Sequence, residues 1–141
     1  MSLPDVPPLT PSLCGTCGIL VNSLMLVFNV GFLRSNSIAT LDPALMSPPG
    51  QLLILLWGAS YYACGREGCG GDVWFVFAVE KAYYVYKWVS WNMTHDAVGL
   101  IKRKLKSRDK MGALAPLFHA TYGAADAVLG CMFFALWRQG R

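Results

Sequence analysis

The chain has 141 residues, of which 55% are hydrophobic and 14% charged, and its formal net charge is +4. The apolar share is too large for an ordinary soluble domain, and the low charge with 13% aromatic residues excludes a disordered chain. No repeated unit suggests a solenoid or a propeller. We therefore expect one all-α domain over residues 1–141, an integral membrane bundle of four transmembrane helices.

The first predicted span covers residues 13–33, an uncharged stretch that follows Ser12 as the expected N-cap and ends before Arg34. At about 1.5 Å per residue it is long enough for the ~30 Å hydrocarbon core of a bilayer. The second span is predicted over residues 48–64, with Ser47 as N-cap and Pro48 in the first turn, and its length is marginal.

The third span is predicted over residues 73–91, because its aromatic and β-branched residues outweigh the charges that it contains. A core helix of a soluble protein is the competing interpretation of this stretch. The fourth span is predicted over residues 114–137, with Pro116 near its start, where proline is tolerated. Tryptophans near the ends of the last two spans, Trp88, Trp91 and Trp137, are typical of an interfacial aromatic belt.

A basic amphipathic segment is predicted over residues 94–110, between the third and fourth spans. Apolar residues recur there at helical spacing opposite the lysines, which favours a short interfacial helix over the alternative of a solvated loop. Clustered basic residues beside apolar spans indicate a membrane surface, not nucleic acid. The residues expected to bind headgroups of anionic lipids are Lys102, Arg103, Lys104, Lys106, Arg108 and Lys110.

Four spans would place both termini and the loop 65–72 on one side, and the loops 34–47 and 92–112 on the other. The basic cluster predicts that the second side faces the cytoplasm, matrix or stroma. The termini are then expected on the non-cytoplasmic side, in an intermembrane space or lumen. The N-terminus has no Lys or Arg before Arg34, so neither a secretory signal nor a transit helix is expected.

Three predicted spans each carry a polar face, and Lys81 lies next to the face of the third span that contains Glu80 and Lys87. The polar residues of these spans are Asn22, Asn29, Glu80, Lys81, Lys87, His119 and Asp126. An isolated charge within a bilayer costs about 2.5–3.5 kcal/mol, so we expect these faces to point into the protein. Counting residues from the membrane face shared by spans three and four places Lys81 and Asp126 at similar depth and predicts an ion pair. Glu80 is then expected to be protonated or hydrogen-bonded to a Tyr or Asn.

Two interpretations of this polar seam stay open. Glu80, Asp126 and His119 could form a proton relay or substrate site, or they could form a polar clamp that fixes helix packing, which we favour. His119 could also be an axial ligand of a haem or chlorophyll, although His95 is the only other histidine. The sequence establishes no cofactor. Bound lipid, chlorophyll and haem are the candidates.

Small residues in the fourth span, Gly123, Ala127 and Gly130, predict the close approach of a helix from this chain or from a neighbour. Four cysteines, Cys14, Cys17, Cys64 and Cys69, are expected near one membrane face. They could bind zinc or form disulfides, and a non-cytoplasmic face favours a disulfide between Cys64 and Cys69. No other metal site is expected. Cys131 is interpreted as an inert apolar residue.

Three groups of stretches carry a family resemblance. They are Pro49-Gly50-Gln51 with Leu56-Trp57-Gly58, Phe77-Ala78-Val79-Glu80-Lys81 with Tyr84-Val85, and Tyr122-Gly123-Ala124-Ala125-Asp126. These stretches, which belong to spans two to four, resemble small four-helix membrane proteins of bacteria and algae that have no assigned activity. The resemblance implies a four-helix architecture and no particular chemistry.

No catalytic motif is present, so we do not expect an enzyme. The sequence favours a small accessory or structural subunit of a larger respiratory, ATP synthase or photosynthetic complex, with other membrane protein subunits as partners. The mitochondrial inner membrane or the thylakoid is favoured, with a bacterial inner membrane as an alternative. The competing hypothesis is a stand-alone small transporter or redox protein that uses Glu80, Asp126 and His119.

Overall fold

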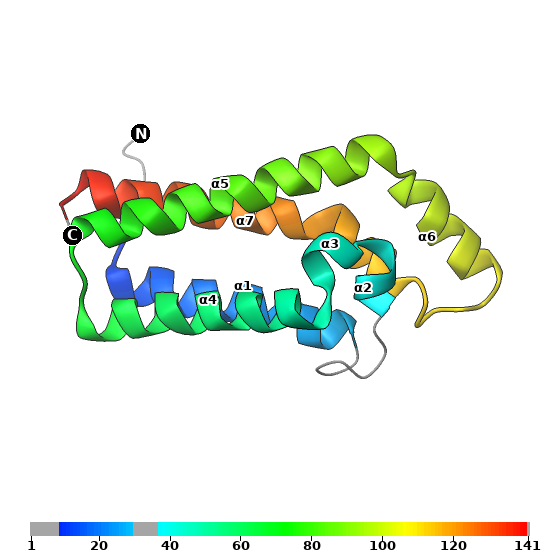
Figure 1. Ribbon diagram of the computed structural model, residues 1–141, viewed down its shortest axis with the longest axis horizontal. Helices are drawn as coiled ribbons and strands as arrows, with labels where there is room; N and C mark the ends of the chain where they lie inside the picture. The colour runs from blue at the N-terminus through cyan, green and yellow to red at the C-terminus, as the bar shows by residue number, and fades with distance from the viewer. Residues whose placement is uncertain (1–8, 30–36, 141) are drawn as a thin grey trace, which may run out of the picture.

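The computed structural model describes residues 9–29 and 37–140, and it is helical with no strand within these two ranges (Figure 1). The four long helices are α1 (Pro11–Phe28), α4 (Pro48–Glu67), α5 (Gly71–Thr94) and α7 (Leu114–Arg138). The short helices are α2 (Ser37–Leu41), α3 (Pro43–Met46) and α6 (Ala97–Lys106). The all-α prediction is confirmed. The predicted helical residues 30–33 and Arg34 lie outside the described residues.

The four long helices match the four predicted spans and extend beyond most of their predicted ends. The N-cap predicted at Ser12 is wrong. Thr10 is the N-cap of α1, because its side chain accepts a hydrogen bond from the Leu13 backbone N–H at 3.2 Å, and Ser12 lies in the first turn. Ser47 does precede α4 as predicted, but its side chain makes no capping hydrogen bond.

The predicted loop 34–47 contains two helices that the sequence analysis did not anticipate, α2 and α3. Asp42 begins α3 by accepting a hydrogen bond from the Leu45 backbone N–H at 3.1 Å, and Pro43 follows in the first turn. The segment packs against the start of α4 and against α7. It therefore closes one end of the bundle (Figure 1).

The long helices form two antiparallel pairs, α1 with α4 and α5 with α7 (Figure 1). Glycines bring the first pair into backbone contact. A Cβ atom on Gly15 would lie 2.5 Å from the Tyr61 carbonyl oxygen, and one on Gly65 would lie 2.6 Å from the Pro11 carbonyl oxygen. In the second pair, Gly123 leaves room for the Trp88 ring. Packing within the chain thus accounts for part of the small-residue surface predicted on α7.

The apolar core consists of two clusters along the bundle. Aromatic rings fill the end that holds the termini, where the centroids of Tyr61 and Phe77 lie 4.8 Å apart. The other cluster contains Tyr84 and Phe118 and reaches α2 and α3. Lys81 lies between Phe77 and Tyr84 along α5, so the polar residues of the interior separate the two apolar clusters.

The two ends of the bundle differ. The turn between α4 and α5 lies at the end with the termini (Figure 1), and there Cys64 and Cys69 lie at disulfide distance with Cα atoms 5.3 Å apart. At the opposite end α6 projects from the bundle. The helix predicted within residues 94–110 is present but shorter, because α5 continues to Thr94 and residues 107–113 form turns.

Within the described residues, α1 and α7 are long and apolar enough to cross a membrane, judged by length and composition. By the same criteria of length and composition, α4 and α5 are not apolar enough. In α5 the reason is composition, since Glu80, Lys81 and Lys87 lie within its central turns.

Candidate functional site

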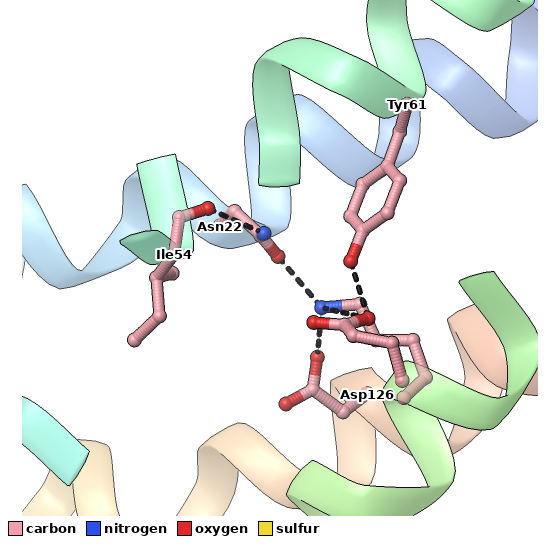
Figure 2. A network of polar contacts seen from close by, with 6 residues as sticks. Asn22, Ile54, Tyr61 and Asp126 are labelled. Atoms are coloured by element: carbon pink, nitrogen blue, oxygen red, sulfur yellow. Dashed lines mark hydrogen bonds and ion pairs between the residues drawn. The ribbon is translucent and has the colours of Figure 1, made fainter. Parts of the chain in front are cut away.

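The centre of the candidate site is the ammonium group of Lys81, which is 2% exposed. Its Nζ lies 2.7 Å from Asp126 Oδ1, the ion pair that the depth count predicts. The same ammonium donates a hydrogen bond to Asn22 Oδ1 at 2.8 Å and lies 3.9 Å from Glu80 Oε2. Figure 2 shows these contacts converging in the interior.

Each long helix contributes to this cluster. Asn22 of α1 also donates its Nδ2 hydrogen bond to the Ile54 carbonyl of α4 at 2.8 Å. The Tyr61 hydroxyl, also on α4, donates a hydrogen bond to Glu80 Oε2 on α5. Residues from both helix pairs thus share one polar network (Figure 2), which joins the pairs across the apolar core.

The cluster does not satisfy all of its polar atoms. Glu80 and Asp126 place two carboxylates beside one ammonium, so the full set of ionised groups carries a formal negative charge. Glu80 Oε1 is buried and has no hydrogen-bond partner among the described residues. Such an atom is costly in an apolar interior, and protonation of Glu80 would remove both the excess charge and part of that cost.

A small cavity of about 30 Å³ adjoins the cluster. Lys81, Asn22 and Asp126 line it on one side, and Tyr122 lines it on another. The Tyr122 hydroxyl is buried without a partner among the described residues. The cavity is lined mainly by apolar atoms, but it is large enough for roughly one water molecule, which could bridge the Tyr122 hydroxyl to the ion pair.

His119 lies apart from the ion pair, towards α2. Its ring is fully buried and stacks on Trp91 with centroids 4.8 Å apart. Its Nε2 donates a hydrogen bond to the Ile38 carbonyl at 3.1 Å. Its Nδ1 has no hydrogen-bond partner among the described residues but is buried, so His119 as it lies presents neither ring nitrogen to a haem or a chlorophyll.

The remaining predicted polar residues are placed elsewhere. Asn29 joins a second network at the end of α1, where its Nδ2 donates to Gln51 Oε1 at 3.3 Å. Gln51 is fully buried and also donates to the Met46 carbonyl at 3.0 Å. Lys87 is half-buried and forms no ion pair with a described residue. The structure therefore does not bring Asn29 or Lys87 into the Lys81 cluster.

An outer groove of about 500 Å³ runs between α5 and α7. Its lining combines small residues with aromatic and branched ones, namely Phe75, Ala78, Val79, Ala82, Val85, Asp126, Ala127, Gly130, Cys131 and Phe134. Asp126 lines both this groove and the inner cavity. One carboxylate thus connects the buried cluster with the outer surface of the bundle.

Sequence reasoning missed Tyr61 and Gln51 as members of the polar networks. Both lie on α4, and the sequence pattern of this helix did not lead us to predict which of its faces is buried. The spacing of Gly58 and Gly65 was an available signal, because each glycine contacts α1 and so marks the buried side of α4. In the described chain no three His, Cys, Asp or Glu residues group as a metal site, and this includes the four cysteines for which zinc was considered.

Comparison of the chain with protein families, with curated proteins and with solved structures finds no match.

Proposed function

We propose that the protein spans a membrane four times and is a non-catalytic accessory subunit of a larger membrane complex. The observation that carries the proposal is the contrast between the two sides of the helix pair α5 and α7. Its inner side is filled by the Lys81 cluster and aromatic rings, with a void of only about 30 Å³. Its outer side bears the apolar groove.

Membrane insertion is supported by the outer surface of the bundle. In the most apolar 18-residue stretch of each helix, only 28% of α1 and 33% of α7 is buried inside the protein. A core helix of a soluble domain is mostly buried. Large apolar side chains are exposed on each long helix, among them Leu20, Val27, Leu53, Leu56, Val76, Val79, Val128 and Phe134. Lipid tails are the solvent that such a surface favours.

The charges of α5 are compatible with a span, because the two innermost are not exposed to lipid. Lys81 and the Glu80 side chain, 2% and 9% exposed, point into the polar cluster. The outward face carries Val76 and Val79. Intramembrane ionisable residues characteristically face the interior and pair with one another.

The proposed orientation follows the charges at the two ends. The described basic residues near the termini are Arg66 and Arg138, whereas the α6 end has six. Loops on the cytoplasmic side of a membrane carry an excess of Lys and Arg, so we propose that the α6 end faces the cytoplasm, matrix or stroma. An energy-transducing membrane, mitochondrial, thylakoid or bacterial, is part of this proposal, and cell fractionation tests it.

The groove favours a transmembrane helix of another subunit as its occupant. Ala78, Ala82 and Ala127 line it and permit close approach of a backbone. Asp126 lines it too, and its cluster has an excess of carboxylates over ammonium groups. A partner helix that carries a hydrogen-bond donor or a basic residue would complement that charge.

Assembly in mild detergent tests the proposal. We expect the native chain to migrate with a large complex, and Ala82→Phe to release it because the ring fills the groove. Ala59→Phe is the matched control, since Ala59 is exposed on α4 outside the groove. Migration of the native chain as a monomer, or equal behaviour of the two variants, would contradict the docking role.

A second candidate function, proton transfer by a stand-alone carrier, is favoured by one observation. The cavity joins the ion pair to the Tyr122 hydroxyl, which has no partner among the described residues, and a water molecule there would extend the network. Proton uptake into vesicles that contain the purified chain tests this function. Tyr122→Phe should reduce the uptake several-fold if the carrier hypothesis is correct, and should leave complex assembly intact.

A further inference from the structure

The helix α6 has an apolar stripe that the described residues leave largely exposed. Ala97 is buried against the bundle, and Leu100 lines a pocket of about 170 Å³ beside α2 and α7. Val98, Ile101 and Leu105 form a separate stripe at helical spacing. Two of these three side chains are more than half exposed, Val98 at 59% and Leu105 at 52%.

The basic residues beside this stripe fall into two groups. Arg103 lies 3.9 Å from Asp96, and Lys104 lies 3.2 Å from Asp109, so these two have acidic partners. The other four form no ion pair with a described residue and are all exposed: Lys102, Lys106, Arg108 and Lys110. This end of the molecule thus presents positive charge that the described chain does not neutralise.

The turn after α6 holds one of these cations in an unusual backbone conformation. The Arg108 N–H bonds the Leu105 carbonyl at 3.1 Å, and the Asp109 N–H bonds the Lys104 carbonyl at 3.0 Å. This pattern ends a helix with a residue in the left-handed region, a position that glycine favours. Here Arg108 occupies it with φ 60°. Strained residues of this kind gather at functional sites.

We propose that α6 and the turn after it bind an anionic phospholipid of the adjacent leaflet. Lys102, Lys106, Arg108 and Lys110 contact the phosphate headgroup, and the stripe of Val98, Ile101 and Leu105 contacts the acyl chains. The inference depends on the proposed membrane insertion for the source of the lipid. The structure narrows the six basic residues expected from the sequence to four, because Arg103 and Lys104 have acidic partners, and it adds the apolar stripe as the site of the acyl chains.

Two features favour a lipid over an acidic protein or a nucleic acid. The apolar stripe is adjacent to the cations, which is the arrangement of helices that lie in a membrane interface. Met111, 57% exposed, continues the apolar surface beyond the turn. Attraction of juxtamembrane cations to anionic lipid adds with each basic residue.

Native mass spectrometry of the full chain in a neutral detergent tests the inference. Phosphatidylglycerol and phosphatidylcholine with identical acyl chains are titrated separately. We expect phosphatidylglycerol to bind at least about tenfold more tightly, since four unpaired cations contribute. Equal binding of the two lipids by the native chain would overturn the inference.

Variants assign the preference to this surface. Lys102→Gln with Lys106→Gln and Lys110→Gln should bring phosphatidylglycerol binding close to the level of phosphatidylcholine. Arg66→Gln with Arg138→Gln, at the opposite end, is the matched control and should leave the preference unchanged. An unchanged preference in the triple variant would overturn the site.

The apolar stripe and the membrane insertion are tested separately. Val98→Ser with Leu105→Ser should weaken binding of both lipids, and competition by glycerol 3-phosphate as strong as by the lipid would overturn the role of the stripe. Alkaline extraction of native membranes reports on insertion. A chain that is extracted but still prefers phosphatidylglycerol would retain the lipid site and lose the proposed four-span subunit function.

Discussion

Two lysines of this chain each pair with an aspartate, and their surroundings make the two pairs very different. Lys81 lies 2.7 Å from Asp126 with side chains 2% and 8% exposed. Lys104 lies 3.2 Å from Asp109 with side chains 49% and 45% exposed. Water can replace either partner of the second pair but not of the first. The buried pair therefore holds α5 and α7 together in the interior, whereas the pair at the end of α6 stays accessible to water.

Removal of the buried carboxylate should have the largest effect. Asp126→Asn leaves the Lys81 ammonium without its nearest counter-charge, and we expect a loss of about 3–5 kcal/mol in the free energy of unfolding. The double change Asp126→Asn with Lys81→Met should recover much of that loss, because it removes both members of the pair. Denaturant titration in detergent measures both variants, and Lys104→Met on the exposed pair is the control, with little change expected.

If the losses of unfolding free energy caused by the two substitutions simply add in the double variant, Lys81 and Asp126 are not energetically coupled. A single Asp126→Asn variant that assembles normally but loses a transport or redox activity would favour the carrier function over the accessory role.

Removal of the Tyr61 hydroxyl, which donates a hydrogen bond to Glu80, should have the second-largest effect on stability. Tyr61→Phe removes a donor to a carboxylate whose other oxygen already has no partner among the described residues, and we expect a loss of about 1–3 kcal/mol. The adjacent Tyr62→Phe is the matched control, since Tyr62 is 37% exposed. Thermal unfolding followed by circular dichroism should separate the two. Equal stability of the variants would show that Tyr61 contributes only its ring.

Relief of backbone strain in the turn after α6 should raise stability, whereas the substitutions in the interior lower it. Arg108→Gly places the residue that tolerates φ 60° and should stabilise the turn by up to about 1 kcal/mol. Ser107→Gly is the control, because Ser107 has φ −76° and gains nothing from glycine. Hydrogen exchange of the α6 amides measures the change. Faster exchange in Arg108→Gly than in the native chain would contradict the assignment of strain.

Acidification should give the smallest effect. The backbone hydrogen bond from Gly112, with the hydrogen bond from Lys104, lowers the pKa of Asp109 below its usual range. Because the pKa is lowered in the folded chain, the stabilisation is present at neutral pH and is lost as the pH falls through the folded-state value. Amide NMR shifts of residues 104–112 should follow this titration. The variant Asp109→Asn should abolish it, and persistence of the titration would point to another acid.

The sequence predicted the central ion pair because helical rise converts residue number into depth. That count needs only the opposite directions of α5 and α7 and the membrane face at which α5 begins and α7 ends, so Lys81 and Asp126 could be paired without knowledge of packing. Tyr61 could not be paired in this way. Tyr61 and Tyr62 are adjacent and lie at nearly the same depth, so the depth count does not distinguish them; the face of α4 that Gly58 and Gly65 turn towards α1 decides which of the two rings points inward.

Helix ends and short helices were harder to predict because their signals are local and compete. Thr10 and Ser12 both qualify as N-caps by residue type, and the proline at position 11, which suits the first helical position, favours Thr10. In α2, five residues form one turn, which is too short for a periodic pattern. Contacts from distant residues stabilise it instead.

Those contacts have a consequence for the order in which the chain folds. The Trp91 indole donates to the Leu41 carbonyl and His119 donates to the Ile38 carbonyl, across sequence separations of 50 and 81 residues. A helix of five residues is not stable alone, because its nucleation costs more than its few hydrogen bonds return. We therefore expect α2 to form only after α7 has been synthesised and has docked. During translation the Ile38 carbonyl would lack its donor until α7, the last helix among the described residues, arrives.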